Sequence, residues 1–588
     1  MPNQDIFATL RAHTIAILAE LLPDLPADSF ARVQMEPPRD SSHGDMATNA
    51  AMVVAKLAKQ PPPKLAAALA ERLALLPEVA EAAPAGPGFV NLRLDEAFIR
   101  AQLSAVLAVG EHYGDSTLGA RVRVNVEYVS ANPTGPMHVG HCRGAVVGDA
   151  LANLLAKAGW AVTKEYYIND AGAQVLALAW AAYWRYLQAI GTTLTEEEFS
   201  AQTPSGLQYR GDYLVPVGQA LAARHGAGLA APGALPAPPE VWLDLVRATT
   251  IDLMMAMIRE DLAALGVKQD VFTSELALVQ AQAIGAAIGT LTAKGLVYEG
   301  VLEPPKGKTP DDWEPREQTL FRSSQFGDDV DRPLRKSDGS NTYFANDIAC
   351  HADKIARGEQ LLIDVWGADH GGYVKRMQAA VNAVSDGAVR LDVVLAQIVH
   401  VVKNGEPVRM SKRAGTYVTL RDLIDEVGRD AVRFTMLTRK ADAQMEFDLD
   451  KVVEQSRDNP VFYVQYAHAR CRSVLRQAGD PADLAAAPLE ALIDPAELAL
   501  IRRIAAWPRI VEAAALAREP HRIAFFLHDL AGDFHVLWNR GREDATLRFI
   551  RESEPVATRA RLALVAATAM VIRSGLQVMG VDAVQEMR

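Results

Sequence analysis

Residues 122 to 126 alternate between apolar and polar side chains, which predicts a β-strand with three valines on one face. The segment PTGP, residues 133–136, then interrupts the regular pattern and predicts a tight loop. A stretch rich in Ala, Leu and Val follows from His138 to Gly159, where glycine is a plausible end for a helix. Strand, loop and helix in this order form the corner at which α/β folds bind phosphate groups. The rest of the chain is interpreted around this segment.

The apolar pattern divides the chain into three regions. Residues 1–110 combine helix-like stretches (6–22, 45–59 and 63–76) with a strand-like segment at 88–94, so we expect a small α+β domain. In residues 111–450, strand-like segments at 122–126, 361–370 and 393–405, and a strand that runs into a loop and helix within 164–174, are separated by helical stretches, which predicts a parallel sheet. Within this region, residues 225–240 are rich in Pro, Gly and Ala and predict a flexible insertion loop. Residues 451–588 show helical spacing throughout.

Length and composition are those of an ordinary soluble protein with several domains. The chain has 588 residues, and single cores rarely grow beyond about 250–300 residues. It has 49% apolar and 22% charged residues, no run of about 18 apolar residues, and no basic-then-apolar start. The cysteines at 142, 350 and 471 are isolated, so we expect neither a zinc site nor a disulfide framework. Isolated cysteines agree with the reducing cytoplasm.

The net charge of −12 argues at first against a nucleic-acid partner, but the charge is unevenly distributed. Residues 451–588 hold 18 basic and 17 acidic side chains, and 17 of the basic ones are arginine. Arginine pairs with phosphates and stacks on bases, so an RNA-facing surface is credible here. A solvated helix face would have the same composition.

Two short motifs carry the candidate chemistry. His138 and His141 are spaced i, i+3 at the predicted helix start, where both can donate to phosphate oxygens, and Gly140 between them leaves room for a nucleotide. Far downstream, residues 403–413 form a Gly-bearing basic loop that could neutralise a departing pyrophosphate. Each motif alone would also suit an exposed helix or a solvated turn.

Together the two motifs resemble the HIGH (as HVGH, residues 138–141) and KMSKS (as RMSKR, residues 409–413) signatures of class I aminoacyl-tRNA synthetases. The surrounding words EYVSANPTGPMHVGH and NPVFYVQYAHAR look specifically like arginyl-tRNA synthetases, and matching segments are spread over most of the chain. One departure is Arg409, where the family pattern has lysine; charge is kept, but guanidinium and ammonium differ in geometry. The resemblance implies a multidomain α/β protein. Its Rossmann-like catalytic core (111–450) would lie between an α+β N-terminal domain that contacts tRNA (1–110) and an all-α anticodon-binding domain (451–588).

The reaction implied by the resemblance joins L-arginine to tRNA(Arg) in two steps and consumes ATP, which would bring Mg²⁺ with it rather than rely on an all-protein metal site. The family also activates its amino acid only with tRNA bound, and we expect this habit here. The implied catalytic residues are His138, His141, Lys403, Arg409 and Lys412. The implied ATP-binding residues are His138, Gly140, His141, Asp369, His370, Met410, Ser411 and Lys412.

Recognition of arginine requires carboxylates that match a planar guanidinium. In the family pattern the words EYVSAN and YFANDIA line the amino-acid pocket, and they correspond to Glu127, Ser130, Asn132, Tyr343 and Asp347 in this sequence; His370 is expected at the adenosine or amino-acid end. Two structural alternatives remain open. Asp347 could cap a helix start, and Glu127 could be an exposed strand residue.

Aromatic and amide side chains in the last region are candidates for tRNA contacts through base stacking and base-edge hydrogen bonds. They are Asn459, Tyr463, Tyr466, Trp538 and Asn539. Packing between helices would explain each of them equally well.

Two competing hypotheses for the whole chain are a small-molecule nucleotidylyltransferase, which shares an HxGH corner, and an RNA-binding paralogue without catalysis. The domains on either side of the core count against the first, and the intact HVGH and RMSKR motifs count against the second. We expect a cytoplasmic monomer that does not associate with membranes.

Overall fold

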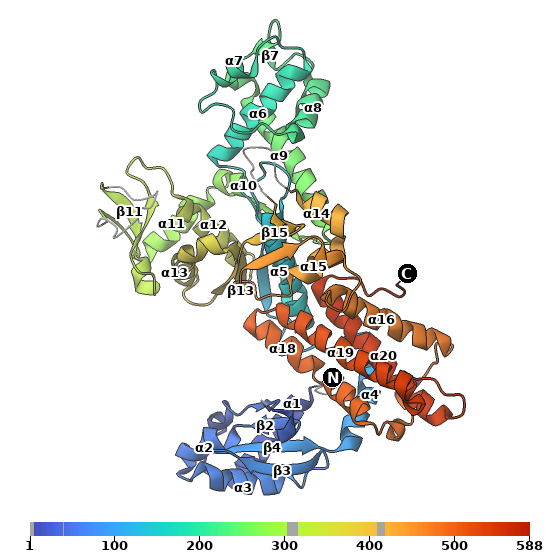
Figure 1. Ribbon diagram of the computed structural model, residues 1–588. Coiled ribbons are helices and arrows are strands. Elements are labelled where there is room, and N and C mark those ends of the chain that lie inside the picture. The colour runs from blue at the N-terminus through green and yellow to red at the C-terminus, as the bar shows by residue number, and fades with distance from the viewer. Residues whose placement is uncertain (1–4, 39, 303–314, 409–417, 588) are drawn as a thin grey trace. The chain divides into compact units, whose positions relative to one another are not determined.

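The computed structural model describes residues 5–38, 40–302, 315–408 and 418–587. The chain forms two compact units (Figure 1). One unit runs from Gly119 to Glu454, and the other combines the chain up to Leu118 with the chain from Gln455 onward. Lys403, Asp369 and all residues expected to bind arginine lie in the first unit, whereas the residues expected to contact the anticodon stem lie in the second.

The first unit is built on a five-stranded parallel sheet with the order β14-β13-β5-β6-β9. Its strands are β5 (Arg123–Glu127), β6 (Ala161–Ile168), β9 (Val271–Ser274), β13 (Leu361–Gly367) and β14 (Arg390–Ala396). Strand order reverses at β5, because β6 lies on one side of it and β13, from later in the chain, on the other. In open parallel sheets the crevice at such a switch point, beyond the carboxyl ends of the strands, is where ligands bind.

Both faces of this sheet are covered, as a parallel sheet requires. Val124 and Val126 of β5 are fully buried, and Asn125, on the opposite face, is fully buried as well. Asn125 donates a hydrogen bond from Nδ2 to Glu165 Oε2 (2.5 Å), so the polar positions of the alternating pattern belong to a buried network. The alternating pattern of β5 is typical of a half-exposed strand, but β5 is a central strand whose apolar face and polar face are both buried.

Further elements of this unit are inserted around the sheet. Its helices are α5 (Val139–Lys157), α6 (Ala173–Ala189), α7 (Glu196–Ser200), α8 (Val215–His225), α9 (Pro239–Ala264), α10 (Glu275–Gln280), α11 (Ala283–Ala293), α12 (Tyr343–Ala356), α13 (Val374–Ser385), α14 (Leu420–Val427) and α15 (Arg429–Met436). Its remaining strands are β7 (Ala230–Ala231), β8 (Leu235–Pro236), β10 (Val297–Gly300), β11 (Gln318–Phe321), β12 (Arg332–Arg335), β15 (Val399–Lys403), β16 (Glu406–Pro407) and β17 (Met445–Asp448).

The insertion between β6 and β9 has a core of its own. The rings of Tyr183 and Trp242 stack with centroids 3.8 Å apart, and Phe199 packs beside them. The segment 225–240, which its composition predicted to be a flexible loop, forms the end of α8 and the short antiparallel pair β7-β8. Tyr183 holds this pair in place, since its hydroxyl donates to the Leu229 carbonyl (2.7 Å) and accepts from the Ala237 N–H (3.0 Å).

The second unit joins an antiparallel sheet of order β1-β2-β4-β3 to two sets of helices. The strands are β1 (Met35–Glu36), β2 (Met46–Thr48), β3 (Val79–Ala85) and β4 (Phe89–Leu94). The helices are α1 (Ile6–Leu21), α2 (Ala50–Ala58), α3 (Pro62–Leu73), α4 (Glu96–Val109), α16 (Pro460–Gln477), α17 (Pro495–Ala505), α18 (Trp507–Ala517), α19 (His521–Glu543) and α20 (Pro555–Met579). Residues of the first 118 bond directly to the helical part: the Tyr113 hydroxyl donates to Ile504 O, and Trp507 Nε1 donates to Tyr113 O.

In the described part of the chain, α20 is the one helix that is long enough and apolar enough to cross a membrane, judged by length and composition alone. Its most apolar window is 78% buried inside the protein. Packing against α16 and α19 accounts for this apolar sequence, which is typical of the central helix of a bundle.

A buried ion pair fixes α15 against α5 on the valine side of the sheet. Arg433 is fully buried, and its Nη2 donates to Asp149 Oδ2 (2.6 Å) while Nη1 donates to Leu265 O (3.0 Å). Lys164 Nζ (2.8 Å) and the Tyr128 hydroxyl (3.1 Å) also donate to Asp149. Burial would raise the pKa of Asp149, but Arg433 and Lys164 outweigh burial and lower it below its usual value.

We expect Arg433→Met to destabilise the first unit by about 3 kcal/mol near neutral pH, because it removes the arginine that pairs with the buried carboxylate of Asp149. Since the folded-state pKa of Asp149 is depressed, its contribution to stability is present above the unfolded pKa, near ~3.9, and is lost as pH falls through the folded pKa. The loss caused by Arg433→Met should therefore shrink in acid. Thermal unfolding followed from pH 7 to pH 3.5 measures this.

The matched control is Lys375→Met, which breaks an exposed pair with Asp329 (3.0 Å) and should cost no more than about 1 kcal/mol. Equal destabilisation by the two substitutions would contradict the assigned importance of the buried pair.

Candidate active site

The first turn of α5 is organised by the two histidines. His138 occupies the N-cap position, where its Nδ1 accepts a hydrogen bond from the Gly140 N–H (3.0 Å), and His141 Nδ1 accepts from the His138 N–H (3.4 Å). The two rings stack with centroids 3.9 Å apart. Because both Nδ1 atoms accept backbone hydrogens, each neutral ring carries its proton on Nε2, which makes Nε2 a donor. A side chain at Gly140 would place its Cβ 2.7 Å from the His138 ring and would therefore displace that ring from its present position.

The basic motif is only partly within the described residues. Lys403 ends β15, is exposed, and pairs with Glu426, which raises the pKa of its ammonium. Arg409, Met410, Ser411 and Lys412 lie outside the described residues. The chain that follows them does reach the first motif: Leu420 N donates to Met137 O (2.8 Å), and His138 pairs with Thr419 in an isolated bridge. The structure thus brings the chain at 418–420, which follows the second motif in sequence, beside the start of the first motif.

Glu127 lies at the carboxyl end of β5, buried against α12, so the alternative of an exposed strand residue is wrong. Its Oε1 accepts from Ser130 Oγ (2.9 Å), and its Oε2 pairs with Lys354 Nζ. Ser130 also accepts a hydrogen bond from the Tyr167 N–H (3.0 Å). The backbone of Ser130 has a positive φ of 37°. Asn132 is exposed nearby, where its Nδ2 donates to Gln174 Oε1 (2.9 Å).

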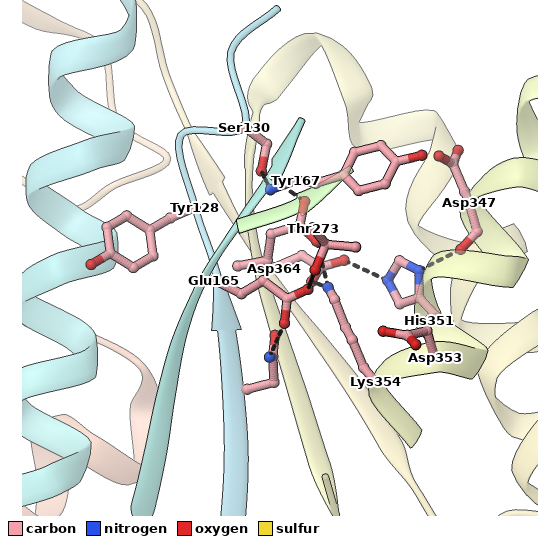
Figure 2. A network of polar contacts seen from close by, with 12 residues as sticks. Tyr128, Ser130, Glu165, Tyr167, Thr273, Asp347, His351, Asp353, Lys354 and Asp364 are labelled. Atoms are coloured by element: carbon pink, nitrogen blue, oxygen red, sulfur yellow. Dashed lines mark hydrogen bonds and ion pairs between the residues drawn. The ribbon is translucent and has the colours of Figure 1, made fainter. Parts of the chain in front are cut away.

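Figure 2 shows a layer of buried charged residues, among them Lys354, His351 and Asp364. Lys354 is fully buried between Glu127 and Asp364, whose Oδ1 is 3.5 Å from its Nζ. His351 contacts Asp364 Oδ2 through Nε2 (2.8 Å) and the Asp347 carbonyl through Nδ1 (2.7 Å), so both ring nitrogens face acceptors. Burial lowers the pKa of Lys354 and of His351, but the carboxylates around them, Asp364 and Glu127 among them, together outweigh burial and raise both pKa values above their usual range. The layer beneath the crevice therefore holds ionised pairs.

A second pair flanks this layer. Arg357 Nη2 donates to both oxygens of the buried Glu165 (2.8 and 2.7 Å), and Thr273 Oγ1 donates to the same carboxylate (2.6 Å). Burial would raise the pKa of Glu165, but Lys354, Thr273 and Arg357 outweigh burial and lower it. Glu165 is thus held ionised by groups of the protein itself.

Asp347 does not cap α12, because Thr342 holds the N-cap position and its side chain accepts from the Ala345 N–H (3.3 Å). Asp347 lies one turn into the helix and points toward the crevice, where it accepts from the Tyr373 hydroxyl (2.6 Å). Burial raises the pKa of this carboxyl to about 6. Tyr343, at the start of α12, is 71% exposed.

Several groups in this crevice were missed by the sequence analysis. His351 and Lys354 were missed although they follow the predicted Asp347 at helical spacings of four and three, so this polar stripe on the helix was a usable signal. Glu275 begins α10 directly after β9, is buried, and accepts from Asn346 Nδ2 (2.8 Å) through Oε1. Nothing local in its sequence distinguishes Glu275 from a common first-turn acid.

The expected nucleotide end of the site is more open. Asp369 and His370 lie in a 3₁₀ turn, η6 (Ala368–Tyr373), just past the carboxyl end of β13, and both are exposed. Their position at the strand ends agrees with the crevice, and their roles remain predictions. Within the described ranges, no group of three or more His, Cys, Asp or Glu side chains is placed to hold a metal ion.

In the other unit, the residues expected to contact RNA gather on α16 and α19. Arg470 lies over the rings of Tyr466 (4.2 Å) and Trp538 (4.5 Å), and its Nη1 donates to His535 Nδ1 (3.2 Å). Burial lowers the pKa of His535 to about 4, so its neutral ring can accept that bond. Arg470 was missed because only its packing between two aromatic rings sets it apart from the other arginines.

Tyr463 lines a cavity of about 660 Å³ together with Arg503 and His528. Asn459 is buried at the start of α16, and Asn539 is exposed on α19. These placements leave both alternatives open, since Tyr463, Tyr466 and Trp538 combine helix packing with partial exposure.

Comparisons with known proteins agree with this geometry. Residues 9–94 match the arginyl tRNA synthetase N terminal domain, residues 102–194 the class I (R) tRNA synthetase catalytic domain, and residues 464–587 the DALR anticodon binding domain. A protein of Gluconobacter oxydans named arginine–tRNA ligase is 62% identical over 591 residues, covering 99% of this chain and 98% of its own. A protein of the same name from Cereibacter sphaeroides (strain ATCC 17025 / ATH 2.4.3) is 58% identical, with coverage of 99% and 100%.

Solved structures show the same fold. An arginyl-tRNA synthetase from Campylobacter jejuni aligns with a TM-score of 0.71 at 29% identity and covers 84% of this chain and 100% of its own. The Thermus thermophilus arginyl-tRNA synthetase aligns with a TM-score of 0.73 at 22% identity, covering 99% and 100%, which supports the fold alone. The resemblance and the fold class that the sequence predicted are confirmed. The chain belongs to the arginine–tRNA ligase family of class I aminoacyl-tRNA synthetases.

Proposed function

We propose that this protein activates L-arginine with ATP and transfers the arginyl group to the 3′-terminal ribose of tRNA(Arg). The observation that carries the proposal is a cluster of three carboxylates, Glu127 at the carboxyl end of β5, Glu275 directly after β9 and Asp347 on α12, in the same unit as the HVGH turn of α5. An acidic crevice suits a cationic amino acid, and a helix start with outward imidazole donors suits a polyphosphate. Relatives named arginine–tRNA ligase over nearly the whole chain support the same activity.

In the first step a carboxylate oxygen of arginine attacks the α-phosphorus of ATP. A bond forms between this carboxylate oxygen and the α-phosphorus. The bond from the α-phosphorus to the oxygen that bridges to the β-phosphorus breaks, and pyrophosphate leaves with that oxygen. His138 and His141 donate from Nε2 to phosphate oxygens as charge develops on them, which their Nδ1 hydrogen bonds make possible. Lys403, Arg409 and Lys412 neutralise the departing pyrophosphate. Mg²⁺ enters on ATP, bound mainly by its phosphates, and supplies further charge neutralisation.

In the second step a terminal ribose hydroxyl of tRNA, the 2′-OH by analogy with class I enzymes, attacks the arginyl carbonyl. The new ester forms as the mixed anhydride breaks, and AMP leaves with its phosphate. Binding and positioning of three substrates provide most of the rate enhancement in such a site, since no side chain becomes covalently attached.

Arginine is held by Asp347 and Glu127 in this proposal, with Ser130, Asn132, Tyr343 and His370 nearby. Lys354 already pairs with Glu127, whereas Asp347 accepts a hydrogen bond from the neutral hydroxyl of Tyr373 and has a raised pKa. Asp347 is therefore the carboxylate best suited to take up a guanidinium charge. We further propose that the protein is a cytoplasmic monomer.

Pyrophosphate exchange across the twenty amino acids tests the function and the requirement for tRNA together. We expect exchange with arginine only, and only when tRNA is added, because the tRNA end completes a misaligned site. Nuclease-treated protein with and without purified bulk tRNA provides the comparison. Strong arginine-dependent exchange without tRNA would remove the tRNA requirement, and exchange with another amino acid would contradict the proposed substrate.

Asp347→Asn and Glu127→Gln should each lower arginine selectivity by about 3–5 kcal/mol, roughly 10²–10³·⁵ in kcat/KM, and leave ATP binding nearly intact. For the wild-type protein, arginine KM should rise as pH falls below about 6, because protonation of Asp347 removes the charge that the guanidinium needs. Asp347→Asn should abolish that rise.

Charging kinetics at pH 5.5 to 8 and direct ATP titration measure these effects, with the exposed Asp329→Asn as the matched control. Wild-type charging efficiency in both variants would place the guanidinium elsewhere.

Lys412→Ala should reduce the rate of arginine activation by about 10²–10³ while KM for arginine changes little, since the charge that Lys412 meets develops mainly in the transition state. Single-turnover kinetics with tRNA present separate the two quantities. Lys451→Ala, which removes an exposed lysine paired with Asp448, is the control. An effect confined to KM would assign Lys412 to ground-state binding.

A further inference from the structure

The hydroxyl of Tyr167 is a buried polar group whose position needs an explanation. Tyr167 is the next-to-last residue of β6 and is paired in register with Thr273 of β9. Residues two apart on a strand share a face, so Tyr167 lies on the same side of the sheet as Glu165 and the ionised layer against α12. Figure 2 shows its ring directed toward Asp347.

The backbone of Tyr167 is tied to the other end of the crevice. Its N–H donates to Ser130 Oγ (3.0 Å), and Ser130 donates to Glu127 Oε1 (2.9 Å). The backbone that carries the Tyr167 side chain is therefore fixed relative to a predicted arginine ligand. A side chain on backbone held in this way is suited to a substrate contact, because less entropy is lost when it binds.

Among the described residues, the Tyr167 hydroxyl has no hydrogen-bond partner, and the same holds for Glu275 Oε2. An unsatisfied buried polar atom costs about 1–3 kcal/mol, and phenylalanine would fill the same space without that cost. Burial, followed by the charges of Cys350, Glu275, Asp347 and Glu127, raises the pKa of Tyr167, so the hydroxyl keeps its proton at neutral pH. It is thus both a donor and an acceptor, and it faces an acidic crevice.

The chemistry of guanidinium fits these groups. Guanidinium is a planar fork of N–H donors, and it needs neutral acceptors as well as carboxylates when it is fully desolvated. The buried Lys354 is already held by Glu127 and Asp364 and is thus committed to the layer beneath. Asp347 and Glu275 remain as negative charges near the Tyr167 hydroxyl.

We propose that the Tyr167 hydroxyl is a specificity contact for the substrate, accepting a hydrogen bond from one guanidinium N–H while donating its own proton to a neighbouring carboxylate. This inference rests on the proposed arginine substrate. Lysine, with a compact ammonium, cannot reach both the hydroxyl and Asp347 as a planar fork does. Citrulline presents a carbonyl oxygen where arginine presents N–H donors and would face carboxylates without a compensating charge.

The deciding variant is Tyr167→Phe, because contact and structural roles predict opposite outcomes. We expect the arginine Kd from calorimetry and the arginine KM in tRNA charging to rise about 10–100-fold, the loss for one hydrogen bond to a charged group. The ligand-free variant should keep or raise the thermal unfolding temperature, since it loses only an unsatisfied polar atom. The kcat for arginine should change little if the contact is equal in ground and transition states.

Tyr183→Phe is the matched control, because the Tyr183 hydroxyl is buried in the insertion and has partners at Leu229 and Ala237. It should lower the unfolding temperature and leave arginine Kd within about twofold. Unchanged arginine Kd and KM in Tyr167→Phe would overturn the proposed contact, and so would a parallel loss of stability and affinity. If the wild-type protein fails to charge arginine, the proposed function itself fails. Wild-type charging with an unaffected Tyr167→Phe overturns only the contact.

Discussion

The fold of the catalytic unit depends on how it buries a cluster of carboxylates at the carboxyl ends of its parallel sheet. Acids alone at this density would repel one another and take up protons. Helix α12 resolves the conflict by placing Lys354 and His351 against Asp364 and Glu127, so that the inner layer is ionised and balanced. The outer carboxylate, Asp347, is left with a neutral partner and a raised pKa. Under the proposed function, a cationic substrate would meet a carboxylate that has no cationic hydrogen-bond partner in the described part of the chain.

The central strand β5 separates two kinds of polar chemistry. On one face its side chains reach the balanced charges of α12, and on the other the chain just beyond it reaches the Asp149 ion pairs of α5. The same strand leads into the turn that starts α5, where His138 caps the helix. The proposed arginine ligand Glu127 and the HVGH turn proposed for phosphate binding are thus separated by only a few residues of backbone, so a shift in β5 would disturb both.

Much of this arrangement could be predicted from the sequence, and the errors have physical causes. The strand, loop and helix around HVGH, the parallel sheet and the helical C-terminal region all follow from local periodicity. Strand β3 was missed, because its Ala-rich sequence has no alternation of strong apolar and polar residues. The alternative role considered for Asp347, that of a helix N-cap, belongs to Thr342 instead, because the N-cap is the residue at which the backbone leaves the extended conformation. The ion pair of Lys354 with Glu127 joins residues more than 200 positions apart, and no local pattern reveals such a contact.

The unit that joins the two ends of the chain has a consequence for biosynthesis. Helix α4 packs on α17 and α20, and Tyr113 bonds to residues of α17 and α18, so the first 118 residues are completed only by the last 134. About 340 residues of the catalytic unit are made in between, which takes roughly 20 s to a minute at ribosomal rates of about 5–20 residues per second. During that interval the apolar side of α4 lacks its native cover. The nascent N-terminal region must therefore remain soluble as an incomplete domain, which makes it a natural client for chaperones that bind exposed apolar helices.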